Sequence, residues 1–429
     1  MNKNFITKKV VKGTFIWLLA TAFYLYENLL QVSQSIIVPE LMRLYDLNAH
    51  ELSSTLGSVF LLAYGACQFP VGILLDKYSS KILLSSATLL CALSCFVYSQ
   101  TSSINFAIMS RLFMGVGSAF AALGCLKLVS NWFEHRFFAF LTGATLSIGL
   151  LGSILGESHL LSLINVQGWR EALKFIALLG FLLAIVLVFF IEDGNLPHSK
   201  NKTTSIPLIE SLKELLAKSQ VWIIAIYGML MFTPFLVLSN LWGPMFISKI
   251  YNLEPAVATQ VFEMIFAGFI FGAPFFGWLS DYILSRKKPL ILASVAALII
   301  STIILFIKAN SLTYIKLLVF LFGFFTSGFL PAFSIIKEIN PKQFSSTALG
   351  FMNTMNSLGG PVILSFMGLA LDYLWDGKTV AGIRDYSIES FKIVFSIFPL
   401  LFLISCVLLM FISETNCKYL NESTGKTNE

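Results

Sequence analysis

Charged residues are scarce in this chain of 429 residues, since Asp, Glu, Lys and Arg together make up 12% of it, whereas a soluble globular domain carries about 25%. Apolar residues make up 56%, and the mean hydropathy is +0.80. So few charges cannot cover the surface of a soluble domain of this length. The composition therefore excludes a soluble protein and indicates a chain that lies largely in the lipid bilayer.

Residues that carry catalytic or metal chemistry are also few. The chain has four histidines and six cysteines. Cys91 and Cys95 share a helix face without metal or redox spacing, so we interpret the cysteines as packing residues. A phosphate-binding loop is missing, because the Gly-Lys-Thr at 425–427 has Leu420 where the first glycine is required. The net charge of +6 is spread too thinly for a nucleic-acid site. We therefore expect no enzyme, no cofactor, no metal and no nucleic-acid partner.

Long apolar runs make up most of the chain. A helix needs about 20 apolar residues to cross the hydrocarbon layer of a bilayer, and twelve runs reach about this length. They are 14–38, 52–75, 81–99, 104–130, 136–160, 169–191, 221–248, 256–280, 289–308, 312–336, 345–374 and 390–412. The sequence predicts an all-α integral membrane protein with twelve transmembrane helices and both termini on one side.

Basic residues are distributed unequally between the loops of the two sides. With these boundaries, eighteen Lys and Arg lie on the side of the termini and six on the other. Because basic loops stay in the cytoplasm, we predict a multi-pass protein of the inner (plasma) membrane with both termini cytoplasmic. The first apolar run is too long for a signal peptide and has no small-residue cleavage site, so we expect it to remain as a membrane helix.

A short motif occurs twice, 205 residues apart, where an apolar run ends. Each copy has Gly-x-x-x-Asp and then basic residues, and the copies are Gly72, Asp76 and Lys77, and Gly277, Asp281 and Arg286. This spacing indicates that one membrane half has been repeated, as in transporters. We predict an N-terminal six-helix bundle at 1–191, a cytoplasmic linker with a short amphipathic helix at 192–220, a C-terminal six-helix bundle at 221–412 and a cytoplasmic tail at 413–429.

The repeated motif resembles a signature of the major facilitator superfamily. Arg111, Gly115 and Gly117 also match the Arg-x-x-x-Gly-x-Gly pattern of that family. The resemblance implies two pseudo-symmetric six-helix bundles that transport a solute by alternating access, and we expect a monomer. In the first copy of the motif, Ser79 and Ser80 stand where the family usually has Gly and Arg.

The resemblance assigns a gating role to the residues of the two motifs. In the family the first carboxylate faces the N-terminus of helix eleven, here Ser345 to Thr347, whose free N–H groups and partial positive charge attract it. We expect Asp76 to latch the cytoplasmic side shut and, by the repeat, Asp281 to do the same for helix five near Arg136. A solvated loop charge is the alternative.

A polar stripe follows one face of the first apolar run. Its members recur at i, i+3, i+4, i+7 and i+11, and they are Tyr24, Glu27, Asn28, Gln31 and Ser35. An ionisable residue inside the membrane is costly and is therefore a functional candidate. We predict that Glu27 and its neighbours bind substrate or a proton, with an interhelical hydrogen bond as the alternative.

Other polar residues are predicted to complete this site. Arg111 either binds a carboxylate or phosphate of the substrate in a two-pronged contact or neutralises Glu27. In the second half, Glu263, Asn353 and Asn356 are candidates for a central site. For Glu263, proton coupling and a role in a periplasmic gate both remain open.

Together these features favour a transporter driven by protons or another coupling ion. We predict proton-coupled uptake of a small charged or zwitterionic solute, such as an amino acid, a short peptide or an organic anion, because Glu27 and Arg111 offer both signs of charge. The drug–proton antiporters of the superfamily carry a Gly-Pro pair on helix five that is missing here, which favours symport. The alternatives are a proton-driven exporter of a metabolite or siderophore and, with least support, a membrane enzyme or sensor.

Overall fold

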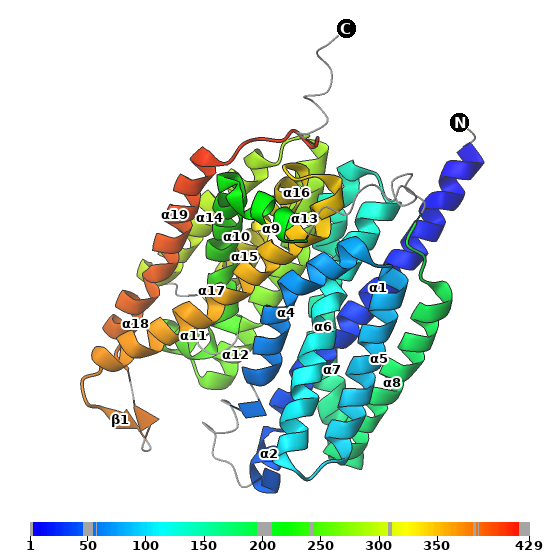
Figure 1. Cartoon of the computed structure of the whole chain (residues 1–429). Helices are drawn as coiled ribbons and strands as arrows, with labels where there is room; N and C mark the ends of the chain where they lie inside the picture. The colour runs from blue at the N-terminus through cyan, green and yellow to red at the C-terminus, as the bar shows by residue number, and fades with distance from the viewer. Residues whose placement is uncertain are drawn as a thin grey trace. The chain divides into compact units, whose positions relative to one another are not determined.

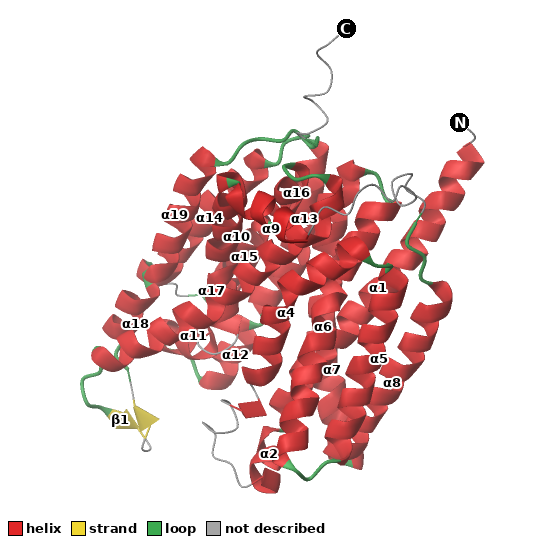
Figure 2. Ribbon diagram, in the orientation of Figure 1, coloured by secondary structure: helices red, strands yellow, loops and turns green. Residues whose placement is uncertain are grey.

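The computed structural model describes residues 3–45, 55–56, 58–194, 208–239, 243–307, 311–380, 383–384 and 386–419. Nearly all of these residues are helical (Figure 2). The strands among them, β1 (Thr379–Val380) and β2 (Ile383–Arg384), form one short antiparallel pair. The chain divides into two compact units: unit 1 is Met1–Ser211 with Pro341–Thr354, and unit 2 is Leu212–Asn340 with Met355–Glu429.

The described residues contain twelve helical stretches that are long and apolar enough to cross a membrane. Each of them overlaps one of the twelve predicted runs, so the prediction of an all-α membrane protein with twelve transmembrane helices is confirmed. The seventh predicted run, 221–248, is divided: α10 (Ser219–Val237) ends early and a separate helix, α11, begins at Gly243. Pro234 lies in the last turn of α10, where proline weakens helical hydrogen bonding.

Unit 1 holds the first six membrane-crossing helices and the start of a later one. Its helices are α1 (Lys3–Ile36), α2 (Val38–Tyr45), α4 (Ser58–Lys77), α5 (Ser80–Gln100), α6 (Ile104–Trp132), η2 (His135–Phe137), α7 (Phe138–Gln167), α8 (Trp169–Phe190), η6 (Lys342–Phe344) and the first turns of α17 (Ser345–Tyr373) (Figure 1). The short α9 (Leu208–Ala217) crosses the boundary between the units in the sequence.

Small residues on α6 bring its neighbours close in unit 1. A Cβ on Gly115 would lie 2.4 Å from the carbonyl oxygen of Phe60 on α4, and one on Gly117 would lie 2.5 Å from the Cys91 sulfur on α5. Membrane helices associate largely through such close packing, because lipid provides no hydrophobic driving force between them. This packing fixes Arg111, one turn before Gly115, against α4.

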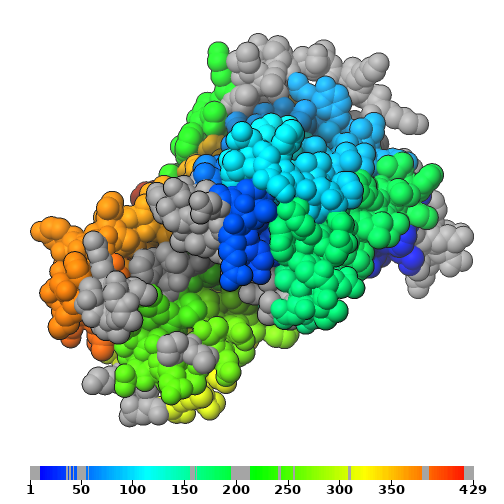
Figure 3. Space-filling model, turned by 90° about the horizontal axis from the view of Figure 1, so that it is seen from below, coloured from blue at the N-terminus to red at the C-terminus, as the bar shows by residue number. Residues whose placement is uncertain are grey.

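A polar contact closes one end of unit 1. Arg170, at the start of α8, donates hydrogen bonds to the carbonyl oxygens of Ser99 (2.9 Å) and Thr101 (3.3 Å) at the end of α5. Tyr45 of α2 donates to the carbonyl oxygen of Thr101 at 3.3 Å. In Figure 3, which looks from below, α2 (blue), the connection between α5 and α6 (cyan) and the start of α8 (green) lie next to one another. The contact holds three helix ends together.

Unit 2 holds the remaining helices around a core rich in phenylalanine. They are α10, α11 (Gly243–Tyr251), α12 (Pro255–Phe262), α13 (Met264–Tyr282), α14 (Lys287–Phe306), α15 (Leu312–Thr326), η5 (Ser327–Phe329), α16 (Pro331–Glu338), the rest of α17, α18 (Ile388–Phe395) and α19 (Ile397–Phe411). The rings of Phe232, Phe235 and Phe269 lie 4.5–6.0 Å apart in tilted and stacked pairs, distances at which aromatic pairs attract one another.

Candidate functional site

The polar stripe of α1 forms a buried hydrogen-bonded group in unit 1. Glu27 is 2% exposed, and the Asn28 amide donates to its Oε2 at 3.0 Å and to the carbonyl oxygen of Tyr24 at 2.8 Å. On α7, Ser153 Oγ donates to Asn28 Oδ1 at 3.3 Å. Gly149 makes room for Tyr24, because a Cβ there would lie 2.2 Å from the tyrosine ring. Within the described residues, neither lysine nor arginine pairs with Glu27.

Residues of α4 and α17 extend this group. The Tyr64 hydroxyl lies beside the side-chain amide of Asn353 and near the Glu27 carboxylate. The Gln68 amide is also close to this hydroxyl, but it does not reach hydrogen-bonding geometry. Of the residues predicted from the second half of the sequence, Asn353 therefore belongs to unit 1 and lies with Glu27 in one polar cluster.

Arg111 is a second buried charge in unit 1. It is 3% exposed, and its Nη1 donates to the carbonyl oxygen of Leu30 on α1 at 3.3 Å. Its guanidinium carbon lies 4.6 Å from the centre of the Phe60 ring, a distance typical of cation–π contacts. Its Nε has no hydrogen-bond partner. In the described part of the chain no carboxylate pairs with Arg111, so it does not neutralise Glu27 directly.

The other predicted site residues have different surroundings. Glu263 does not lie inside a continuous helix, because α12 ends at Phe262 and a one-residue turn at Glu263, which is exposed, leads into α13. Gln31 is exposed on α1, and the side chain of Ser35 lies outside the described set. Asn356 belongs to unit 2, is 1% exposed and has an unpartnered Oδ1.

The first Gly-x-x-x-Asp motif places a carboxylate at the start of α17. Asp76 accepts hydrogen bonds from the backbone N–H of Ser346 (3.0 Å), from the N–H of Thr347 (2.7 Å) and from the Thr347 hydroxyl (2.7 Å). Lys127 of α6 adds an ion pair at 3.3 Å. Gly72 permits the approach, since a Cβ there would lie 2.4 Å from the Ser346 carbonyl oxygen. We call Asp76, Ser346 and Thr347 the α17 contact; its role as a latch stays a prediction.

The second copy of the motif has an arginine where the first has none. In unit 2, Arg286 is fully buried; it binds the Asp281 carboxylate and donates to Glu338 at 2.9 Å and to Ser280 at 3.0 Å. Gly277 is buried on α13 and Lys77 of the first copy is exposed. The contact of Asp281 with the fifth predicted membrane helix, which corresponds to α7, stays a prediction.

In each half, a carboxylate just after the sixth membrane helix accepts hydrogen bonds from the N-terminus of the third membrane helix. In unit 1, Asp193 accepts from the Ser79 hydroxyl and from the backbone N–H of Ser80. In unit 2, Glu414 accepts from the Ser285 hydroxyl (2.6 Å) and from the backbone N–H of Arg286 (2.9 Å). Carboxylates stabilise helix N-termini in this way. By these matching hydrogen bonds, Ser79 of unit 1 corresponds to Ser285 of unit 2, and Ser80 corresponds to Arg286.

The hydrogen bonds at Glu414 have an electrostatic consequence. Partial burial by itself would raise the pKa of Glu414, but the hydrogen bonds from Ser285 and from the backbone N–H groups of Asn416, Lys287 and Arg286 outweigh it, and the pKa lies below its usual value. Glu414 therefore binds these donors as a carboxylate at neutral pH.

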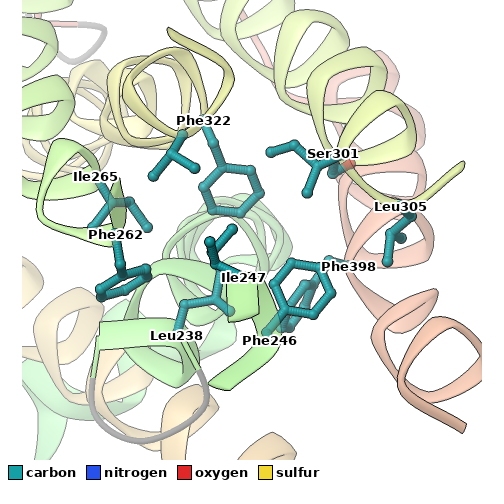
Figure 4. Close-up of a pocket in the computed structure, with 11 residues that line it drawn as sticks. Leu238, Phe246, Ile247, Phe262, Ile265, Ser301, Leu305, Phe322 and Phe398 are labelled. Atoms are coloured by element: carbon teal, nitrogen blue, oxygen red, sulfur yellow. The ribbon is translucent and has the colours of Figure 1, made fainter. Parts of the chain in front are cut away.

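Unit 2 contains a small, partly open pocket. Its volume is about 20 Å³, and it is lined mainly by apolar side chains that include Leu238, Phe262, Phe322 and Phe398 (Figure 4). Such a volume is about that of one water molecule, and an apolar void stays empty. The cavity is a gap in packing and offers no room for a solute.

Four side chains in these clusters were not assigned to a site from the sequence: Tyr64, Gln68, Lys127 and Ser153. Of these, Lys127 was interpreted as a lysine that extends to the cytoplasmic boundary of the membrane. A signal for two of them exists, because Phe60, Tyr64, Gln68, Gly72 and Asp76 follow one another at four-residue intervals along α4. Residues at this spacing lie on one side of a helix. Lys127 and Ser153 can be recognised only from their contacts, with Asp76 on α4 and Asn28 on α1 respectively.

Comparisons with known proteins agree on one family. A sequence model of the Major Facilitator Superfamily matches residues 16–363 and 237–427. A probable hexose phosphate transport protein of Chlamydia muridarum is 21% identical, with 76% of this chain and 78% of that protein covered. A probable nitrate transporter of Staphylococcus epidermidis is 23% identical, with 77% and 83% covered. The crystal structure of FucP, an E. coli fucose:proton symporter, is similar in fold, with a TM-score of 0.72, 15% identity and 94% and 99% of the two chains covered.

Proposed function

We propose, from the premise that this chain belongs to the Major Facilitator Superfamily and is a multi-pass membrane transporter, that it carries a small organic anion into the cell together with a proton. The proposal places the chain in the inner membrane with both termini cytoplasmic, which the excess of Lys and Arg in the loops on that side supports.

The observation that carries the proposal is the unpaired Arg111. A buried guanidinium without a counter-ion is costly, since desolvation is not offset by a paired charge. An anionic substrate would supply the missing charge, and a guanidinium suits carboxylate and phosphate groups because it can donate two parallel hydrogen bonds. Relatives named for hexose phosphate and nitrate support an anion over a cation or a neutral solute.

Glu27 is the proposed proton carrier. Its carboxylate is buried beside Asn28 and close to Tyr64, with no cation paired to it among the described residues. Binding of a proton would remove the charge and with it the cost of keeping a carboxylate in the membrane. Release of that proton on the other side would then drive the solute inward. Tyr24, Asn28, Gln31 and Asn353 would hold the site around it, and Glu263 and Asn356 stay candidates in unit 2.

The two motif regions are proposed as gates for alternating access. Asp76 at the start of α17 would stabilise one closed state, with Gly72 allowing the approach and Lys77 adding charge at the same end. Asp281, with Gly277 and Arg286, would do the same in the other half. Binding of substrate and proton would shift the balance between the states.

Uptake into proteoliposomes tests the proposal. With the wild-type protein, we expect counterflow of labelled organic anions such as gluconate and glycerol 3-phosphate, and accumulation when the outside is made acidic. Arg111→Lys keeps the charge but removes the planar guanidinium, which can donate two parallel hydrogen bonds. The affinity for a carboxylate should therefore fall by about 1–3 kcal/mol, or about 5- to 150-fold.

A matched control is Arg170→Lys. Arg170, at the start of α8 in the same unit, donates hydrogen bonds to backbone carbonyl and hydroxyl oxygens of residues 99–102. This change should leave the affinity unaltered. Counterflow of cations or neutral solutes without any anion would contradict the proposal. An unchanged affinity in Arg111→Lys would reduce Arg111 to packing.

A further inference from the structure

Gln68 of α4 has hydrogen-bonding capacity that the described residues leave unused. Its side chain is fully buried, and although the Tyr64 hydroxyl lies close to the amide, neither Nε2 nor Oε1 makes a hydrogen bond. Buried polar atoms in proteins are almost always paired, and an unpaired one is costly. A buried amide whose two polar atoms make no hydrogen bond is therefore a candidate for binding a ligand.

The contacts between α4 and α17 show what lies at the level of Gln68. The two helices run in opposite directions, because Asp76 meets Ser346 and Thr347 while the carbonyl oxygen of Gln68 meets Gly350 further along α17. One turn beyond, Asn353 lies beside Tyr64.

A second unpaired group lies one turn further along α17, next to Asn353 and therefore at the level of Tyr64. Thr354 is on the same side of α17 as Thr347 and Gly350, by the i, i+3, i+7 spacing. Its hydroxyl is buried and lacks a partner in the described part of the chain. Gln68, beside Tyr64, and Thr354, next to Asn353 in the sequence, thus leave two polar side chains unused along the stretch of α4 and α17 that carries Tyr64 and Asn353.

The chemistry of these groups indicates the ligand. A glutamine amide offers an NH2 donor group and an acceptor oxygen side by side, and a threonine hydroxyl both donates and accepts. A carboxylate, phosphate or sulfonate group only accepts, whereas an alcohol does both, so the pair is complementary to alcohol groups. We propose that Gln68 and Thr354 bind hydroxyl groups of the transported anion, so that the substrate is a hydroxylated organic anion of the sugar-acid or sugar-phosphate class. This inference rests on the proposed anion transport.

Pairs of anions that differ only in their hydroxyl groups test the inference. Galactarate and adipate share a six-carbon dicarboxylate chain, and glycerol 3-phosphate and propyl phosphate share a three-carbon phosphate ester. Wild-type protein in proteoliposomes should take up the hydroxylated member of a pair with the lower KM. Gln68→Leu keeps the volume but removes both polar atoms, so the KM for the hydroxylated member should rise about 10- to 100-fold, while the KM for the other member stays within about twofold.

Thr354→Val, which replaces the hydroxyl by a methyl group, should act in the same direction and serves if Gln68→Leu does not fold. Gln34→Leu is the matched control, because Gln34 is another buried glutamine of unit 1 with an unpartnered Oε1, on α1; it should leave the preference unchanged. The preference between the two members is a readout that a loss of packing alone would not move.

The outcomes separate this inference from the proposed function. Uptake of adipate or propyl phosphate as readily as of the hydroxylated member, or an equal rise of both KM values in Gln68→Leu, would overturn the hydroxyl site while anion transport stands. If the wild type transports no member of either pair and no other anion, both the proposed function and this inference fail.

Discussion

Replacing Asp76 by Asn removes one charge from the start of α17 while keeping the size of the side chain. The carboxylate is 6% exposed in its side chain and accepts three hydrogen bonds from Ser346 and Thr347. Asn keeps one acceptor oxygen, so the main loss is the attraction between the charge and the helix N-terminus, roughly 0.3–1 kcal/mol and up to about 2 kcal/mol when partly buried. If the α17 contact is a latch, the populations of closed and open states should shift about two- to thirtyfold toward opening at this end.

Distances between spin labels report this opening. Tyr78, after α4, and Gln343, in η6, are exposed positions on either side of the α17 contact. With labels on cysteines placed there, in a chain whose native cysteines are replaced, pulsed electron resonance should show a larger population at long distance in Asp76→Asn than in the wild type.

Two controls isolate the charge at Asp76. Asp76→Asn leaves Lys127 without its ion pair, so the double change with Lys127→Gln shows whether the orphaned lysine causes the shift. Glu134→Gln removes an exposed carboxylate of the same unit that pairs with Arg136 and should have no effect. Identical distance distributions in the wild type and in Asp76→Asn, or a shorter distance in the variant, would refute the latch.

Other changes test further contacts. Glu27→Gln should abolish accumulation driven by a proton gradient while sparing exchange if Glu27 carries the proton; normal accumulation at every pH would exclude that role. Gly72→Ala puts a Cβ 2.4 Å from the Ser346 carbonyl oxygen and should open the α17 contact as Asp76→Asn does, at a cost of about 1–3 kcal/mol; an unaltered label distance would show that the helices move apart freely. Asp281→Asn should open the same membrane face, checked with labels on both halves, and no change there would remove Asp281 from the gate. The pKa of Glu414 is lowered in the folded protein, so its contribution to stability is complete above the pKa of the unfolded chain, about 4.3, and is lost as the pH falls through the pKa of the folded protein. The melting temperature of the wild type should therefore drop more steeply below about pH 4.3 than that of Glu414→Gln. Parallel curves of melting temperature against pH would contradict this.

The membrane architecture was accessible from the sequence because it depends on a property that every residue of a run shares. A run such as 169–191 needs no knowledge of its neighbours to be recognised, since its length and apolar character suffice. The contact of Asp76 with the start of α17 was accessible for a different reason: a motif resemblance carried the tertiary information. Composition alone gives no such pairing.

The polar cluster shows where sequence reasoning stops. Glu27 stands out because neighbouring polar residues repeat with helical period on α1, whereas Gln68 is a single amide in an apolar helix. Asn353 was assigned to the second half by its number, yet it packs in unit 1 beside Tyr64. The turn at Glu263 was also hidden, because the apolar character continues through it from α12 into α13.

The pairing of Glu414 with the start of α14 gives the segment after α19 a structural task. Glu414 holds Ser285 and the first N–H groups of α14, and the next residue, Thr415, donates a hydrogen bond to Glu338 at the end of α16. A stop codon placed directly after the last apolar residue of α19 would thus remove the hydrogen bonds at the start of α14 and the end of α16, although it deletes no membrane-crossing helix. Affinity tags and fluorescent fusions on this protein should be attached beyond residue 419, and a trimmed chain that loses expression would owe the loss to assembly of unit 2 rather than to transport.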